Sequence, residues 1–183
     1  MEQSRQLGDG KILSLLFKFS IPAIIGMLVN SLYNIVDRIF IGNSAGTLGI
    51  AAITIGFPMM LVIIAFILLI GIGANSLVSI KLGEENKDES ERILGNAFTL
   101  LILVSLAITI LGLLFLEPML KFFGASNEVL PYAKDYMQII LYGTVFQSIG
   151  FGLNNFIRGE GNPKMAMITM LMGAFLNAVF CPI

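Results

Sequence analysis

The chain has 183 residues, of which 56% are hydrophobic and only 13% are charged, and its mean hydropathy is +0.89. Soluble domains contain about 25% charged residues, so this composition argues against an ordinary soluble fold. The net charge of −1 provides no basic field for nucleic acid. The sequence has no histidine, the usual metal ligand and neutral-pH proton switch, and its single cysteine excludes a disulfide framework. No metal site or cofactor is therefore expected.

Five apolar runs in the sequence are long enough to cross a membrane. They cover residues 12–41, 50–80, 93–116, 130–157 and 164–183. A helix needs about 20 apolar residues to cross a hydrocarbon core of about 30 Å. Only helices satisfy all backbone polar groups there without strand partners. The sequence therefore predicts an all-α membrane protein, a polytopic bundle of about five transmembrane helices forming a single domain over residues 1–183.

The first run has one polar face. Asn30, Tyr33, Asn34 and Asp37 follow the spacing i, i+3, i+4, i+7, which places them on one side of a helix. Asp37 is the only acidic residue inside any of the five runs, apart from those in their terminal turns. Because ionisable residues in spanning helices are costly and usually functional, this face predicts a polar cavity. The alternative is that Asp37 lies near the outer interface and pairs with water or with Arg38, although adjacent helical residues point in different directions.

Two prolines lie inside the first and second runs. Pro22 and Pro58 each remove a backbone hydrogen bond, so each is expected to kink its helix, and Pro22 is a candidate hinge. The end of the second run, residues 71–79, is rich in small residues. Small residues let membrane helices approach closely, so this segment is interpreted as a packing surface rather than a site.

The loop over residues 81–92 is strongly charged and helps to set the orientation. Lysines and arginines of one side are Arg5, Lys11, Lys81, Lys87, Arg92, Arg158 and Lys164, and those of the other side are Arg38, Lys121 and Lys134. Because cytoplasmic loops hold an excess of such residues, the N-terminus and this loop are predicted to face the cytoplasm.

The fourth and fifth runs also contain polar residues at helical spacing. Asn154 follows Gln147 by seven residues and shares its face. Asn154 either lines a cavity or bonds to another helix, a contact that stabilises bundles by about 1 kcal/mol. In the fifth run Gly173, Asn177 and Cys181 follow at steps of four, so they also share a face.

Four sequence blocks together resemble the multidrug and toxic compound extrusion (MATE) transporters. They are IPAIIG at residues 21–26, YNIVDRIFIG at 33–42, RGEGNPK at 158–164 and LNAVFCPI at 176–183. The resemblance implies two six-helix lobes around a central cavity that opens alternately to either side. It implies export of organic cations and other amphipathic compounds in exchange for Na⁺ or H⁺. This chain would cover four helices and most of a fifth in the N-terminal lobe, and the C-terminal lobe would be its missing partner.

The resemblance also assigns roles to residues. Asp37 resembles the family's cation-coupling aspartate of the first helix, and Asn177 resembles the fifth-helix asparagine beside it. The positions that match the family's cavity are Asn30, Tyr33 and Asn154, and Asn34 shares the face of the first two. The family usually has aspartate where this chain has Cys181, and a neutral thiol does not balance a cation as a carboxylate does.

The sequence thus favours the N-terminal part of a cation-coupled exporter of amphipathic or cationic compounds in the cell membrane, in contact with lipid. Two alternatives stay open. One is a non-transporting truncated fragment, which the apolar run that reaches Ile183 favours. The other is a lipid-linked-sugar flippase of the same superfamily, which would favour more cationic residues deep in the helices. An enzyme is disfavoured because the sequence shows no nucleophile–base pair, metal cluster or phosphate loop.

Overall fold

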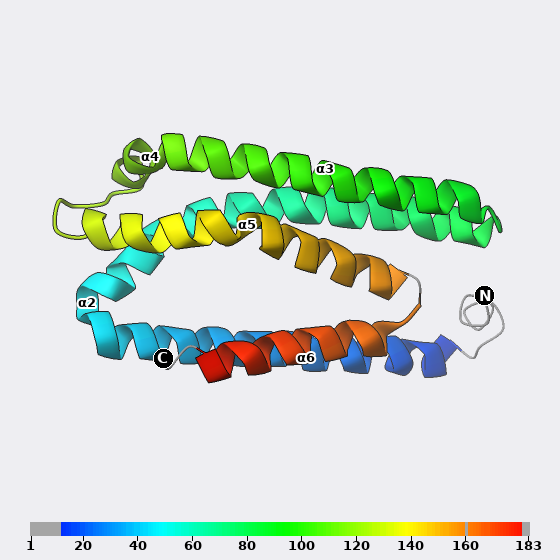
Figure 1. Cartoon of the computed structure of the whole chain (residues 1–183). Helices are drawn as coiled ribbons and strands as arrows, with labels where there is room; N and C mark the ends of the chain where they lie inside the picture. The colour runs from blue at the N-terminus through cyan, green and yellow to red at the C-terminus, as the bar shows by residue number, and fades with distance from the viewer. Residues whose placement is uncertain (1–11, 160, 181–183) are drawn as a thin grey trace.

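The structure, a computed structural model, describes residues 12–159 and 161–180, and these residues form a bundle of helices (Figure 1). The helices in chain order are α2 (Ile12–Gly83), α3 (Lys87–Leu114), α4 (Leu116–Phe122), α5 (Leu130–Gly159) and α6 (Pro163–Phe180).

The helix α2 is turned at Gly46. The sequence predicts separate helices over 12–41 and 50–80, whereas helical backbone angles continue through both ranges and are interrupted inside α2 only at Gly46, with φ 60° and ψ −149°. Glycine adopts a positive φ at little steric cost because it has no Cβ. Residues 12–45 are called the N-terminal arm of α2 below, and residues 47–83 the C-terminal arm.

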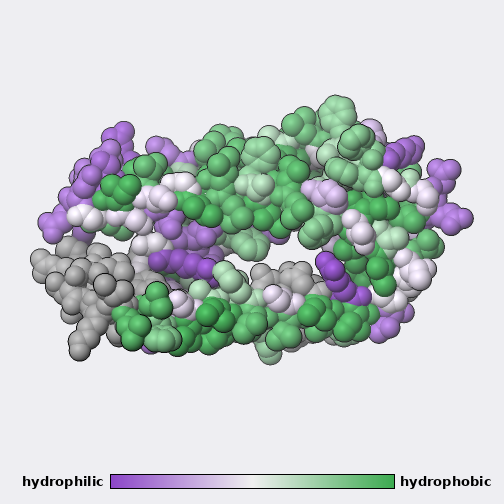
Figure 2. Space-filling model, turned by 180° about the vertical axis from the view of Figure 1, so that it is seen from behind, coloured by the Kyte–Doolittle hydropathy of each residue, from purple (hydrophilic) through white to green (hydrophobic). Residues whose placement is uncertain are grey.

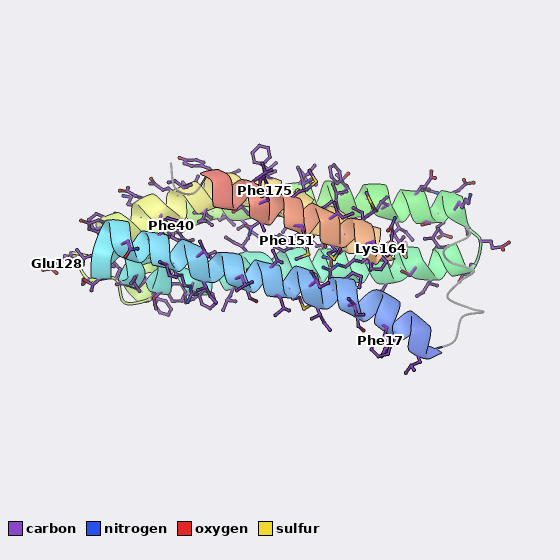
Figure 3. The ribbon with its side chains drawn as sticks, turned by 90° about the horizontal axis from the view of Figure 1, so that it is seen from below. Phe17, Phe40, Glu128, Phe151, Lys164 and Phe175 are labelled. Carbon is purple, nitrogen blue, oxygen red and sulfur yellow. The ribbon has the colours of Figure 1, made fainter. Side chains whose placement is uncertain are left out.

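The prolines of α2 do not interrupt it. Pro22 is buried and Pro58 is half-buried, and both lie in helical backbone. In Figure 3 the beginning of the N-terminal arm, which carries Phe17, leans away from the line of the rest of the arm.

The helix α3 begins earlier than the apolar pattern indicates, at residue 87 rather than 93. The cause is its N-cap: the side-chain oxygen of Asn86 accepts a hydrogen bond of 3.2 Å from the backbone N–H of Glu89. Asp88 and Glu89 lie in the first turn, where acidic groups complement the helix dipole. After a break at Phe115 the chain forms α4, a seven-residue helix that the sequence analysis does not predict.

The helices form two groups (Figure 1). The C-terminal arm of α2 packs with α3 and α5 in one group, and α6 lies along the N-terminal arm in the other. The core lies in the first group, where the buried side chains include Ile63, Leu101, Met137 and Leu141.

The face of the bundle seen in Figure 2 is largely hydrophobic between its two ends, where hydrophilic side chains gather. Two segments of the described chain, Gly46–Gly83 and Lys87–Leu114, have the length and composition of membrane spans, with 38 and 28 residues. Their outward side chains include Leu69, which is 70% exposed, and Leu103, which is 60% exposed. In a bilayer such side chains are covered by hydrocarbon, so their exposure in the bundle agrees with helices that cross a membrane.

Candidate functional site

The polar face predicted for the first run lies on the N-terminal arm of α2. The backbone of Asn30, Tyr33, Asn34 and Asp37 is helical, so their spacing keeps them on one side of the arm. Asn177 lies in α6. The side chains of these five residues are outside the described part of the structure, and Cys181 lies outside the described residues.

The structure brings the two helices of this predicted cation site together. The helix α6 packs against α2, and Figures 1 and 3 both show it beside the N-terminal arm. The helix with Asp37 and the helix with Asn177 are therefore neighbours. In the space-filling view, openings separate the two helix groups, and hydrophilic side chains lie at their edges (Figure 2).

Asn154 joins α5 to α6. Its amide nitrogen donates to the backbone oxygen of Ala166 at 2.8 Å and to the hydroxyl oxygen of Thr169 at 2.9 Å. The Thr169 hydroxyl itself donates to the same Ala166 oxygen at 2.8 Å. Both amide hydrogens of Asn154 therefore bond between α5 and α6. Of the two roles predicted for Asn154, lining a cavity or bonding to another helix, the structure shows the bond to another helix.

Arg158 is a half-buried cation at a junction of three helices. Its Nη2 donates to the Met170 sulfur of α6 at 3.0 Å. A Cβ placed on Gly26 of the N-terminal arm would lie 3.2 Å from that sulfur and 4.0 Å from Nη2. Among the described residues Arg158 has no ion pair. The sequence pattern indicates only that Arg158 is a cytoplasmic cation, because its neighbours here, Met170 and Gly26, belong to other helices.

A second close approach joins the C-terminal arm of α2 to α5. A Cβ on Gly159 would overlap the side-chain oxygen of Asn75, so only glycine fits there without movement. That Asn75 oxygen is buried and has no hydrogen-bond partner among the described residues. The interpretation of residues 71–79 as a packing surface agrees with this contact.

No cluster of three or more His, Cys, Asp or Glu side chains in the described part of the chain is placed to hold a metal ion.

Comparison with known proteins places the chain in a transporter family. The MatE family profile matches residues 22–183. Over 182 residues the chain is 30% identical to the multidrug export protein MepA of Staphylococcus haemolyticus (strain JCSC1435), a match that covers 100% of this chain and 40% of that protein. It is 24% identical over 165 residues to the probable multidrug resistance protein YoeA of Bacillus subtilis (strain 168), over 90% of this chain and 36% of the relative.

A solved structure gives the same result. The MATE multidrug transporter DinF-BH in complex with rhodamine 6G superposes with a TM-score of 0.86 at 39% identity, over 98% of this chain and 41% of that chain. The chain spans about 40% of the length of these relatives and corresponds to an N-terminal portion of them. The predicted fold class, an all-α bundle of the MATE type, is confirmed. The chain belongs to the MatE family, the multidrug and toxic compound extrusion transporters of the membrane.

Proposed function

We propose that this chain provides the cation-coupling helices of an exporter that moves amphipathic or cationic organic compounds out of the cell in exchange for Na⁺ or H⁺. The observation that supports the proposal best is the similarity to a transporter whose structure contains rhodamine 6G, at 39% identity and a TM-score of 0.86. Because the chain spans about 40% of such relatives, the proposal includes a second lobe supplied by the remaining length.

Asp37 is the proposed coupling group. A carboxylate among apolar helices is strongly favoured to bind a proton or a cation, because an isolated charge there is costly. Binding of H⁺ or Na⁺ removes the negative charge that holds a cationic substrate, and the substrate is then released to the outside. Asn177 on the neighbouring α6 is proposed to add an amide ligand to the cation, and Asn30, Tyr33 and Asn34 to line the cavity. Asn154 is proposed to join α5 to α6 at the edge of this cavity.

The proposed movement involves the N-terminal arm of α2. Pro22 is buried within this arm and lacks the N–H that would complete the helical ladder. Bending at Pro22 costs fewer hydrogen bonds than bending elsewhere, so Pro22 is the proposed hinge. Cys181 supplies no charge near neutral pH, so the proposed coupling passes through Asp37 alone.

The function is tested in a chimera in which residues 22–183 replace the matching segment of the S. haemolyticus MepA. In cells without other drug exporters, the chimera is expected to expel ethidium. Asp37→Asn keeps the size of the side chain but removes its titrating group, so efflux should fall at least about tenfold, equal to a loss of about 1.4 kcal/mol or more of coupling.

Asp37→Glu is the matched control, since it keeps the carboxyl group, and it should retain most of the efflux. Membrane levels of the three proteins are compared by immunoblot. Efflux by Asp37→Asn equal to that of the parent, at equal membrane level, would reject Asp37 as the coupling residue.

A further inference from the structure

An apolar pocket lies away from the candidate cation site, between the C-terminal arm of α2 and α3. Its volume is about 540 Å³. Met59 and Val62 form one wall, and Leu111 of α3 and Phe115, the residue between α3 and α4, form the other. Met119 and Phe122 of α4 close one end. All of its lining residues are apolar.

The pocket is a groove that opens on the outer surface of the bundle. At its floor Ile63 is 3% exposed and Leu141 of α5 is 1% exposed. At its mouth Leu111 is 56% exposed and Val62 is 49% exposed. The lining residues of α3 are Ile108, Leu111 and Gly112, which share one stripe of the helix, and Phe115 follows directly after the helix ends, so the groove is elongated along the helix axis.

The chemistry of the walls decides which ligand fits. An organic cation, the proposed transport substrate, would lose its hydration in this groove without gaining a counter-charge or a hydrogen bond, which is unfavourable. A hydrocarbon chain needs neither and gains about 25 cal/mol for each Å² of apolar surface removed from water. The volume lies within the range of about 300–1,000 Å³ that holds ligands of moderate size.

The position of the groove in the bundle indicates where a hydrocarbon chain would come from. The two walls belong to the segments with the length and composition of membrane spans, so the mouth faces the acyl chains of a bilayer. Beyond the closed end, Glu117 of α4 pairs with Lys121 at 2.8 Å and with Lys134 of α5 at 3.5 Å. Each lysine ammonium has three N–H donors, so Lys121 and Lys134 can donate to a lipid phosphate as well as to Glu117.

We propose that the groove between the C-terminal arm of α2 and α3 binds one acyl chain of a bilayer phospholipid, with α4 at the level of its headgroup. The acyl chain of the lipid lies along the helix axes, as acyl chains do in a bilayer. It fills the groove beside Leu111 and Phe115, and the lysines of α4 and α5 face the phosphate.

The test uses the chain reconstituted in lipid nanodiscs that contain a phosphatidylcholine with a diazirine on one acyl chain. After illumination, residue-resolved mass spectrometry locates the adducts. Labelling of Leu111, Phe115 and Met119 is expected to exceed labelling of Leu103, an equally lipid-facing residue of α3, by at least about fivefold.

Leu111→Trp fills the groove and should lower its labelling at least about fivefold, equal to about 1 kcal/mol. Ile110→Trp is the matched control, because Ile110 is also 56% exposed but does not line the groove, and it should leave the labelling unchanged. Circular dichroism checks that both variants keep their helix content. If Leu111→Trp loses helix content, Val62→Trp is used in its place.

Three results would overturn the proposal. Equal labelling of the groove and Leu103 would show only general lipid contact. Displacement of the label by added rhodamine 6G would show a drug site. Cross-links between two copies of the protein at the groove, with loss of lipid labelling there, would show a dimer contact.

Discussion

At the scale of single residues, the contact between Gly159 and Asn75 holds α5 against α2 most closely. Gly159→Ala places a methyl group where the Asn75 oxygen lies, so the buried Asn75 side chain must move or the helices must separate. Overpacking of this kind costs about 1–3 kcal/mol of unfolding free energy. Thermal unfolding in detergent, followed by circular dichroism, measures the loss.

The matched control is Gly73→Ala, since a Cβ on Gly73 would meet nothing within 4 Å. This change should leave stability equal or raise it by up to about 1 kcal/mol through helix propensity. If the two variants were equally stable, the close approach at Gly159 would be of no consequence for packing.

The spacing of polar residues predicts their faces but not their partners. The sequence places Asn154 on a face with Gln147 and leaves two roles open for it. The structure gives it bonds to Ala166 and Thr169 of α6. Helical periodicity fixes which residues of one helix share a side, whereas the helix opposite that side depends on tertiary packing. The role of Asp37 rests on resemblance for the same reason.

At the scale of the elements, the long helices are predicted well and the joints between them less well. Residues 42–49 contain glycine, serine and threonine, all weak helix formers, so a gap between two helices is expected there. The structure needs only one non-helical residue, Gly46, to turn the chain. The helix α4 is missed because seven residues are too few to show a hydrophobic period.

The helix α4 is anchored by the buried side chains of Leu116 and Leu120, and its exposed ion pairs add a small contribution that depends on pH. A hydrogen bond from Lys121, the charge of Lys121 and the weaker contact with Lys134 lower the pKa of Glu117 from its ordinary value of 4.5. A lowered pKa in the folded state means that these contacts stabilise α4 above pH 4.5. The stabilisation is lost as the pH falls through the lowered pKa.

A spin label at Phe122→Cys, in a Cys181→Ser background, reports this change. Its mobility is expected to be low at neutral pH and to rise as the pH falls below 4.5. In a Glu117→Gln background the mobility of the label should not change between neutral pH and pH 4, because the amide does not ionise. A label whose mobility follows the same pH curve in both backgrounds would contradict this assignment.

At the scale of the whole molecule, the arrangement in two helix groups does not itself define which end faces the cytoplasm. The distribution of lysine and arginine predicts that the loop over residues 81–92 faces the cytoplasm. Gly83→Cys and Asn127→Cys, both exposed and at opposite ends of the bundle, test it in the Cys181→Ser background. An impermeant maleimide should label Asn127→Cys in intact cells and Gly83→Cys only after lysis, and the reverse pattern would invert the orientation.

The central claim is that residues of this chain couple a cation gradient to export, and flux in proteoliposomes tests it most directly. The chimera with MepA is reconstituted, and either a Na⁺ or a proton gradient is imposed across the membrane. One of these ion gradients is expected to drive ethidium to accumulate against the ethidium concentration gradient, and Asp37→Asn is expected to abolish the accumulation. Equal gradient-driven accumulation by the Asp37→Asn protein, or none by the parent chimera under either gradient, would contradict it.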